Sequence, residues 1–271
     1  MKKIDDILEV EEIQGVLAKG TTEPVRCRLE NGLNVVVKYM RNRFGQQVLV
    51  NELIGSSIAD LLGVTVPEYG ICNLSEEVIF NTNENEEISI QNAGLAFFTK
   101  DYSSSTPLVR SMLALAENKE TEKIILFDHI VNNADRHDGN LILDIKKSVT
   151  LYVIDNSHIV ARNIEDTLDI LQAELEEESI FSNRILEKNK DVYELLCTGI
   201  GYSEERMLKE AERIKEILTS TKILEIKNTI PEIWTNFVGD DRINIIFEII
   251  NKRIFSICDI AEMIIRERRK L

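Results

Sequence analysis

A short polar stretch in the middle of the sequence holds residue types that phosphate chemistry uses. Residues 132–141 read NNADRHDGNL and lead from one apolar segment into another, and Asp155 closes the apolar run LYVID. Phosphoryl transfer from ATP needs a carboxylate that orients the attacking hydroxyl group, and oxygen ligands that hold Mg²⁺ against the phosphates. Asp135, Asn140 and Asp155 supply these groups, so they predict a phosphoryl-transfer site.

The segments around these residues predict elements that could hold them in place. Residues 121–134 place apolar side chains at helical spacing, and two short strands are expected over 141–145 and 149–154, joined by a lysine-rich turn. Asp135 would then follow the end of a helix, and Asp155 would lie just beyond the second strand.

The first hundred residues predict a β-sheet with one helix. From residue 8 to about 39 the sequence is rich in β-branched residues, and Asn31-Gly32 is a tight-turn signal between two apolar runs. Lys38 lies near the end of the clearest strand in this region. Residues 49–62 have apolar positions at helical spacing and are followed by Gly63, which is typical of the position after a helix C-terminus.

The residue order of the polar stretch resembles that of a known kinase family. Asp135-Arg136-His137 followed by Asn140 is similar to the HipA-like kinases, and to the phosphatidylinositol kinases to which that fold is related, whereas ordinary protein kinases have the order His-Arg-Asp. The resemblance implies that Asp135 is the catalytic base, Asn140 a Mg²⁺ ligand and Asp155 the principal Mg²⁺ ligand. Asn156-Ser157 departs from the Phe-Gly that many kinases have here, so a switch that moves a phenylalanine is not expected.

The same resemblance extends to the N-terminal strands. The run VVVK that ends at Lys38 is similar to the kinase strand whose lysine contacts the phosphates of ATP, and Glu52 of the following helix would pair with that lysine. The loop with Gly20, Thr21 and Thr22 would cover the phosphates with its backbone N–H groups. In the family this loop can be modified by autophosphorylation, but its residue types are also those of an ordinary turn.

Two further predictions concern adenine and the reacting groups. A buried strand over 93–99 would lead into the connection between the lobes, with Phe98 and Thr99 touching adenine, although aromatic residues in strands usually belong to the core. His137 would contact phosphate or substrate, or else only hydrogen-bond within its loop, and His158 leaves the same choice open.

Together these features predict an α+β protein with a two-lobed protein-kinase-like fold. Residues 1–102 would form a small antiparallel β N-lobe that binds ATP, and residues 103–271 a mainly helical C-lobe with the catalytic loop. The expected function is ATP- and Mg²⁺-dependent phosphoryl transfer to serine or threonine of a protein, with an antitoxin or regulatory protein as an open further partner. Two alternatives remain: a small-molecule kinase of aminoglycoside or polyol type, and a nucleotide-binding pseudokinase that acts as a regulatory module.

Composition and charge limit the other partners. The 271 residues include 47 acidic and 32 basic side chains, a formal net charge of -15, so a nucleic-acid backbone would be repelled. The sequence holds neither an apolar run of about 18 residues nor the apolar core of a signal peptide, and a cytoplasmic protein without membrane contact is expected. The acidic run 165–178 predicts a solvated helical face, with a docking surface for a basic partner as the alternative, and 243–271 predicts one long amphipathic helix.

Overall fold

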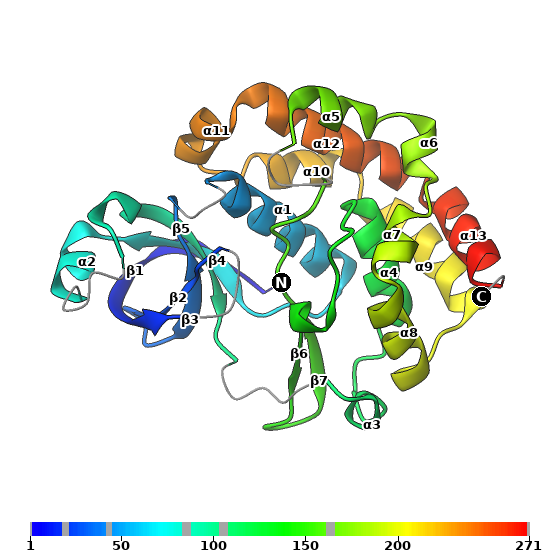
Figure 1. Ribbon diagram of the computed structural model, residues 1–271, viewed down its shortest axis with the longest axis horizontal. Coiled ribbons are helices and arrows are strands. Elements are labelled where there is room, and N and C mark those ends of the chain that lie inside the picture. The colour runs from blue at the N-terminus through cyan, green and yellow to red at the C-terminus, as the bar shows by residue number, and fades with distance from the viewer. Residues whose placement is uncertain are drawn as a thin grey trace.

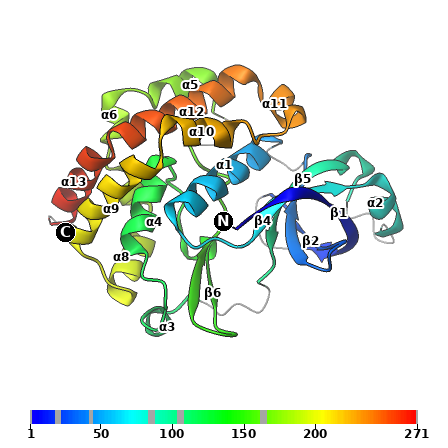
Figure 2. The same cartoon turned by 180° about the vertical axis from the view of Figure 1, so that it is seen from behind.

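The computed structural model describes residues 2–17, 22–41, 45–82, 88–102, 108–160 and 166–269. Within these ranges a β-barrel lies at one end of the molecule and a helical body at the other, with helix α1 between them (Figure 1, and from behind in Figure 2). The strands are β1 (Lys3–Val16), β2 (Val25–Leu29), β3 (Asn34–Lys38), β4 (Tyr69–Leu74), β5 (Gly94–Lys100), β6 (Leu141–Asp144) and β7 (Thr150–Val153). The helices before β6 are α1 (Gln47–Leu62), α2 (Glu76–Thr82), α3 (Arg110–Leu113) and α4 (Thr121–Ile130), with single 3₁₀ turns at η1 (Ile90–Asn92) and η2 (Asp138–Asn140). The later helices are α5 (Leu168–Ala173), α6 (Glu177–Ile180), α7 (Arg184–Lys188), α8 (Lys190–Gly199), α9 (Glu204–Ile217), α10 (Ser220–Lys227), α11 (Glu232–Val238), α12 (Asp240–Phe255) and α13 (Ile257–Arg268).

The N-terminal sheet closes into a barrel with the strand order β1-β2-β3-β5-β4. All neighbours are antiparallel except β1 and β4, which run parallel and pair Lys3 with Tyr69. The expected antiparallel sheet is therefore found, except that this one seam is parallel. The 14 residues of β1 are long enough for its first half to pair with β4 and its second half with β2, and register shifts along the strand allow the turn between the two partners.

Side chains along β3 and β5 point alternately to the inside and to the outside of the barrel. Val37 and its partner Phe98 point into the apolar interior of the barrel, where both are fully buried. Lys38 and its partner Phe97 occupy the next register position and face the opposite side, where Phe97 joins the core of the helical body. Lys38 is thereby directed out of the barrel toward α1.

Helix α1 forms as the sequence predicts and lies deep in the molecule. Gly63 ends it with a φ of 71°, and its backbone N–H donates to carbonyl groups of the last turn. Thirteen of its sixteen residues are buried, because the barrel covers one side and the helices of the C-terminal region cover the other. Since α1 shares its apolar core with those later helices, the boundary near residue 102 stays a prediction.

Two expectations for the C-terminal region are wrong. The tail is not one long helix, because the chain breaks at Ser256 between α12 and α13, which lets α13 pack against α9. The acidic run is not uniformly solvated either, since Glu174 is fully buried and bonded by Asn132 and Arg184. In the ranges that the structure describes, the helices are all too short or too polar to span a bilayer.

Candidate active site

Lys38, Glu52 and Asp155 meet where the barrel, α1 and the end of β7 come together. Lys38 Nζ forms an ion pair with Glu52 and a second one with Asp155 Oδ1 at 2.9 Å. Lys38 is 9% exposed and Glu52 2% exposed, so their pair is shielded from water. The pairing of Lys38 with Glu52 is the one expected from the sequence, and the structure adds Asp155 as a third member.

Burial and charge act against one another in this trio. Burial lowers the pKa of Lys38, but the carboxylates of Asp155 and Glu52 outweigh it and raise that pKa above its ordinary value. Burial raises the pKa of Glu52 to about 6, although Lys38 lowers it. Burial also acts to raise the pKa of Asp155, but Lys38 and the Ser157 hydroxyl bring it far below its ordinary value. At neutral pH Lys38 is therefore a cation and Asp155 an anion.

The backbone at Asp155 adopts a conformation that directs its carboxylate. Its φ of 59° lies in the left-handed region, which is uncommon outside glycine and recurs at functional sites. Ser157 fixes the Asp155 side chain with two hydrogen bonds. Its hydroxyl donates to Asp155 Oδ1 at 2.5 Å, and its backbone nitrogen donates to the same atom at 3.3 Å. The Asp155 side chain remains 36% exposed, so a ligand can reach it.

Asp135 and Asn140 lie at the two ends of one loop. Asn140 Nδ2 donates to the Asp135 carbonyl at 2.8 Å, and the Ile154 backbone N–H donates to the Asn140 carbonyl at 3.0 Å. The second bond brings Asn140 beside the segment that ends in Asp155. The Asp135 side chain is 49% exposed, so this carboxylate is open to an incoming acceptor.

The oxygen atoms of this site suit a Mg²⁺ ion that also binds phosphate groups. Because Nδ2 of Asn140 is occupied by the bond to Asp135, Oδ1 is the atom of that amide that can ligate a cation. The described ranges contain no cluster of three or more His, Cys, Asp or Glu that could hold a metal ion on its own. One carboxylate and one amide are enough where phosphates and water provide the other ligands, as is usual for Mg²⁺ in phosphoryl-transfer sites.

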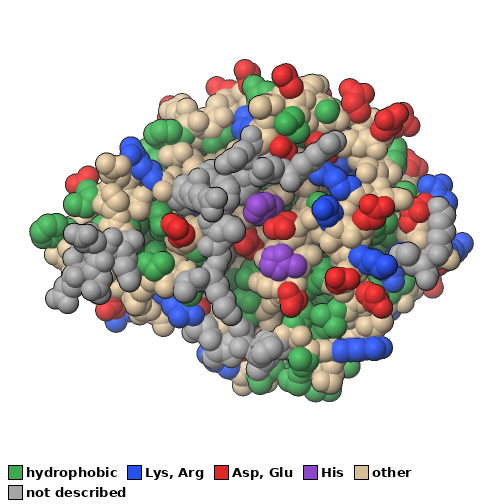
Figure 3. Space-filling view, in the orientation of Figure 1, with side chains coloured by type: hydrophobic (Ala, Val, Ile, Leu, Met, Phe, Trp, Pro, Cys, Tyr) green, Lys and Arg blue, Asp and Glu red, His purple; other side chains and the backbone are tan. Residues whose placement is uncertain are grey.

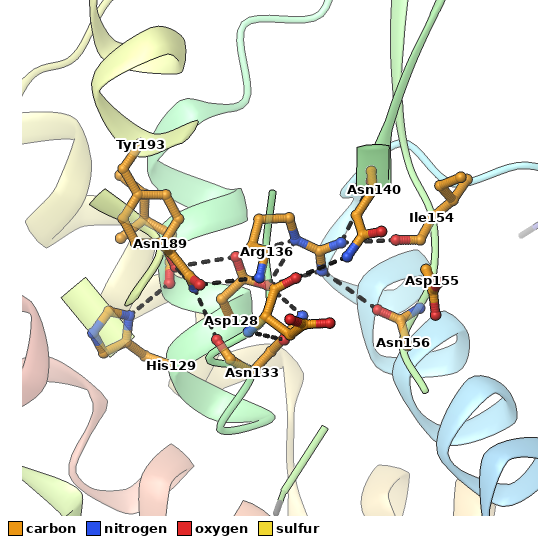
Figure 4. A network of polar contacts seen from close by, with 12 residues as sticks. Asp128, His129, Asn133, Arg136, Asn140, Ile154, Asp155, Asn156, Asn189 and Tyr193 are labelled. Atoms are coloured by element: carbon orange, nitrogen blue, oxygen red, sulfur yellow. Dashed lines mark hydrogen bonds and ion pairs between the residues drawn. The ribbon is translucent and has the colours of Figure 1, made fainter. Parts of the chain in front are cut away.

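Arg136 lies at the centre of the polar network in Figure 4 and holds the loop from Asp135 to Asn140. Its guanidinium group is fully buried and forms an ion pair with the equally buried Asp128 at 2.8 Å. Nη1 donates to the Ile154 carbonyl at 2.7 Å, and Nη2 reaches the Asn156 side chain at 3.5 Å. One arginine therefore ties the loop that carries Asp135 to the residues on both sides of Asp155.

Asn189, which immediately precedes α8, and Tyr193 within α8 complete this network. Asn189 accepts a hydrogen bond from the Arg136 backbone N–H at 3.0 Å and donates one to the Asn133 carbonyl at 2.9 Å. The Tyr193 hydroxyl donates to Asp128 at 3.0 Å. Asn189 thus clamps the backbone on both sides of Asp135 (Figure 4).

The two surface histidines take different places. The His137 side chain is 57% exposed, and its ring accepts the Gly139 backbone N–H, which is the structural alternative left open for it. His158 is the histidine beside the proposed base, with Nε2 3.9 Å from Asp135 Oδ2. Histidine and acidic side chains gather in the middle of the face seen in Figure 3.

The structure supports only some of the other predicted nucleotide contacts. The Phe98 ring is fully buried in the barrel core, which argues against its contact with adenine. Thr99, one position further, faces the other side and pairs with Val36, two residues before Lys38. Neighbours in a strand point in opposite directions, so only one of the pair Phe98 and Thr99 could face the site.

Of the loop residues predicted to cover the phosphates, Thr22 is buried at 3% exposure, and Gly20 and Thr21 lie outside the described residues.

Sequence reasoning missed Arg136, Asp128, Asn156 and Asn189 as parts of the site. A signal existed for Asp128, because it is a charged residue at helical spacing on the same face as buried apolar residues of α4. A charge at such a position requires a partner. Nothing in the sequence marks Asn189, which lies more than fifty positions from the loop that it holds.

Comparison with known families gives a match over most of the chain. The sequence profile of a family described as "HipA-like kinase" matches residues 10–258. The curated proteins that were compared contain no match to the sequence.

Comparison with solved structures gives matches among kinases. The Helicobacter pylori proinflammatory kinase CtkA superposes with a TM-score of 0.57 at 13% identity, covering 92% of this chain and 94% of CtkA. A Golgi casein kinase with Mn and ADP bound gives 0.49 at 11% identity, covering 96% of this chain and 73% of the other. Another structure of the Golgi casein kinase gives 0.46 at 11% identity, covering 98% and 76%. The likeness to CtkA shows that the chain has a kinase fold.

Proposed function

Because the chain belongs to the HipA-like kinase family, we propose that it transfers the γ-phosphoryl group of ATP, with Mg²⁺, to a serine or threonine hydroxyl of a protein. The observation that carries the proposal is the convergence of Lys38, Glu52 and Asp155 beside the loop from Asp135 to Asn140. Five residues from four separate segments of the chain are brought to one place with the charges that this reaction needs.

Each of these residues has a distinct task. Lys38, held by Glu52, neutralises phosphate charge, and Asp155 and Asn140 would hold Mg²⁺, which supplies further neutralisation when bound. Asp135 accepts a hydrogen bond from the acceptor hydroxyl and then its proton. Phosphoryl transfer requires little covalent chemistry from the protein, so the rate depends on positioning and on charge.

The exposure of Asp135 supports a protein acceptor. Its side chain is 49% exposed. An extended peptide can bring a hydroxyl to such a position from solution, whereas a small substrate is usually enclosed by its pocket.

The test is transfer of label from [γ-³²P]ATP with Mg²⁺, to the protein itself and to casein or myelin basic protein. We expect labelled serine or threonine with the wild type, none after Asp155→Ala, and normal labelling after Asp169→Ala, which removes an exposed acid of α5. Turnover on a polyol or aminoglycoside without protein labelling would point to the small-molecule kinase. ATP binding without any transfer would point to the pseudokinase.

A further inference from the structure

Helix α1 is joined directly to the segment that follows Asp155. Glu52 Oε2 accepts the Asn156 backbone N–H at 3.1 Å, and Asn51 Nδ2 donates to the Ser157 carbonyl at 2.7 Å. One turn later, the Ser56 hydroxyl accepts the Asn156 side-chain amide at 3.4 Å. Consecutive turns of one helix thus hold the backbone on the C-terminal side of Asp155.

Asn156 lies between α1 and the catalytic loop. It is 1% exposed, and its Oδ1 faces Nη2 of Arg136 at 3.5 Å (Figure 4). The same arginine bonds to the Ile154 carbonyl on the other side of Asp155. Asn156 therefore contacts both α1 and Arg136 of the loop that carries Asp135.

Gly55 makes this close approach feasible. A Cβ atom at position 55 would overlap with the Cβ of Asn156 and lie 2.7 Å from its Cγ and 3.1 Å from its Nδ2. Glycine is among the least favourable residues inside a helix, and here it lies in the middle of a well-formed one. The contact with Asn156 accounts for its presence.

We propose that Asn156 is a positioning residue that fits against Gly55 and so locks α1 to the segment following Asp155. The lock keeps Lys38, Glu52 and Asp155 assembled in the protein as it folds, without a separate activating step. In protein kinases the corresponding lysine–glutamate pair and metal-binding aspartate must be brought into place by movement of a helix and an activation loop. The inference rests on the proposed function for its effect on catalysis, but the lock itself is a feature of the nucleotide-free protein.

The test uses Gly55→Ala, Asn156→Gly and the double variant. An alanine should favour the helix yet push α1 away from Asn156, whereas glycine at 156 removes the atoms with which it collides. Gly199→Ala is the control for a crowded helical glycine elsewhere, because its Cβ would lie 2.8 Å from Leu113 Cβ, in α8 against α3. Two properties are measured: the phosphoryl-transfer rate at saturating ATP, and hydrogen exchange of residues 156–160 and of α1 without nucleotide.

We expect Gly55→Ala to lower the transfer rate at least about tenfold and to speed exchange of residues 156–160 by a similar factor. The double variant should recover part of both losses, because the collision is gone, and this coupling separates a specific contact from general damage. Gly199→Ala should change neither property at the site, even if its thermal midpoint falls.

Wild-type exchange in Gly55→Ala, or losses in the double variant that equal the sum of the two single losses, would overturn the lock. If the wild-type protein transfers no phosphate, the proposed function fails, and the exchange measurement still decides on the lock. A Gly55→Ala protein that does not fold would leave the decision to Asn156→Gly, which should loosen α1 exchange on its own.

Discussion

Loss of the Arg136–Asp128 pair should destabilise the fold strongly. Both side chains are 0% exposed, and the carboxylate also accepts a bond from Tyr193. Removing one member of a buried ion pair leaves the other charged and without compensation, which costs about 3–5 kcal/mol. We expect Asp128→Ala to lower the free energy of unfolding by that amount in urea titrations.

The matched control is Glu212→Ala, an exposed acid of α9, which should leave the unfolding free energy nearly unchanged. A loss for Asp128→Ala no larger than that of the control would contradict the account of the buried pair.

At the scale of single residues, motif order allowed Lys38, Glu52, Asp135, Asn140 and Asp155 to be chosen from the sequence, and the structure brings them together. Their roles stay predictions until they are tested. Phe98 could not be placed correctly by motif order, because the side of a strand that a residue faces depends on register and on what covers each side.

At the scale of elements, the junction between α7 and α8 supports the loop around Asp135 through Asn189. We expect Asn189→Ala to lower the transfer rate about tenfold with little change in ATP affinity, because the loop around Asp135 loses its clamp while Lys38 and Asp155 keep their contacts. Stopped-time transfer assays and calorimetric titration with ATP measure the two quantities.

Two further variants make that result specific. Asn189→Asp keeps the acceptor for the Arg136 N–H but buries a carboxylate against the Asn133 carbonyl, so a loss of rate at least as large as for Asn189→Ala is expected. Asn244→Ala removes an exposed asparagine that bonds only to a surface lysine in the described contacts, and should behave as the wild type. An equal fall in ATP affinity for Asn189→Ala would argue for a general loss of structure instead.

The elements themselves were predictable to different degrees. Helix α1 and the β6–β7 hairpin follow from apolar spacing and end signals, which are local properties. The parallel seam between β1 and β4 and the break at Ser256 are not local, since each depends on which distant surface the segment must cover. Those were the features that the sequence pattern did not reveal.

At the scale of the whole molecule, the helical body is joined to the barrel by more than α1. The Trp234 side chain of α11 is fully buried and donates to the Leu95 carbonyl of β5 at 3.2 Å. The net charge of -15 counts buried acids such as Asp128 and Glu174 together with the exposed ones. The buried acids hold the fold together rather than form a solvated surface. Charge totals from sequence could not separate the two groups.

Acid should weaken the fold through His129. This fully buried residue has its pKa lowered to about 4, because burial disfavours its charged form. Below its unfolded value of about 6.5, the unfolded chain binds a proton that the folded protein does not. Folding stability should therefore fall as the pH drops from about 6.5 to 4, by about 3 kcal/mol from this group, and change no further through it below that range.

Urea unfolding at several pH values measures this effect as a difference between variants. His129→Gln should flatten the dependence between pH 6.5 and 4 relative to the wild type, whereas His137→Gln, at an exposed position, should not. Parallel curves for wild type and His129→Gln would show that His129 is not the group responsible.

The most direct test of the central claim is the rate of phosphoryl transfer by Asp135→Asn at saturating ATP, compared with Asp138→Asn in the same loop. Asp138 has an 80% exposed side chain and is assigned no part in the reaction, so its variant should act as the wild type. A general base that takes the proton of the attacking hydroxyl group raises the rate by a factor of about 10² to 10⁴. We predict a loss of that size for Asp135→Asn with ATP affinity unchanged, and transfer at the wild-type rate would contradict the account.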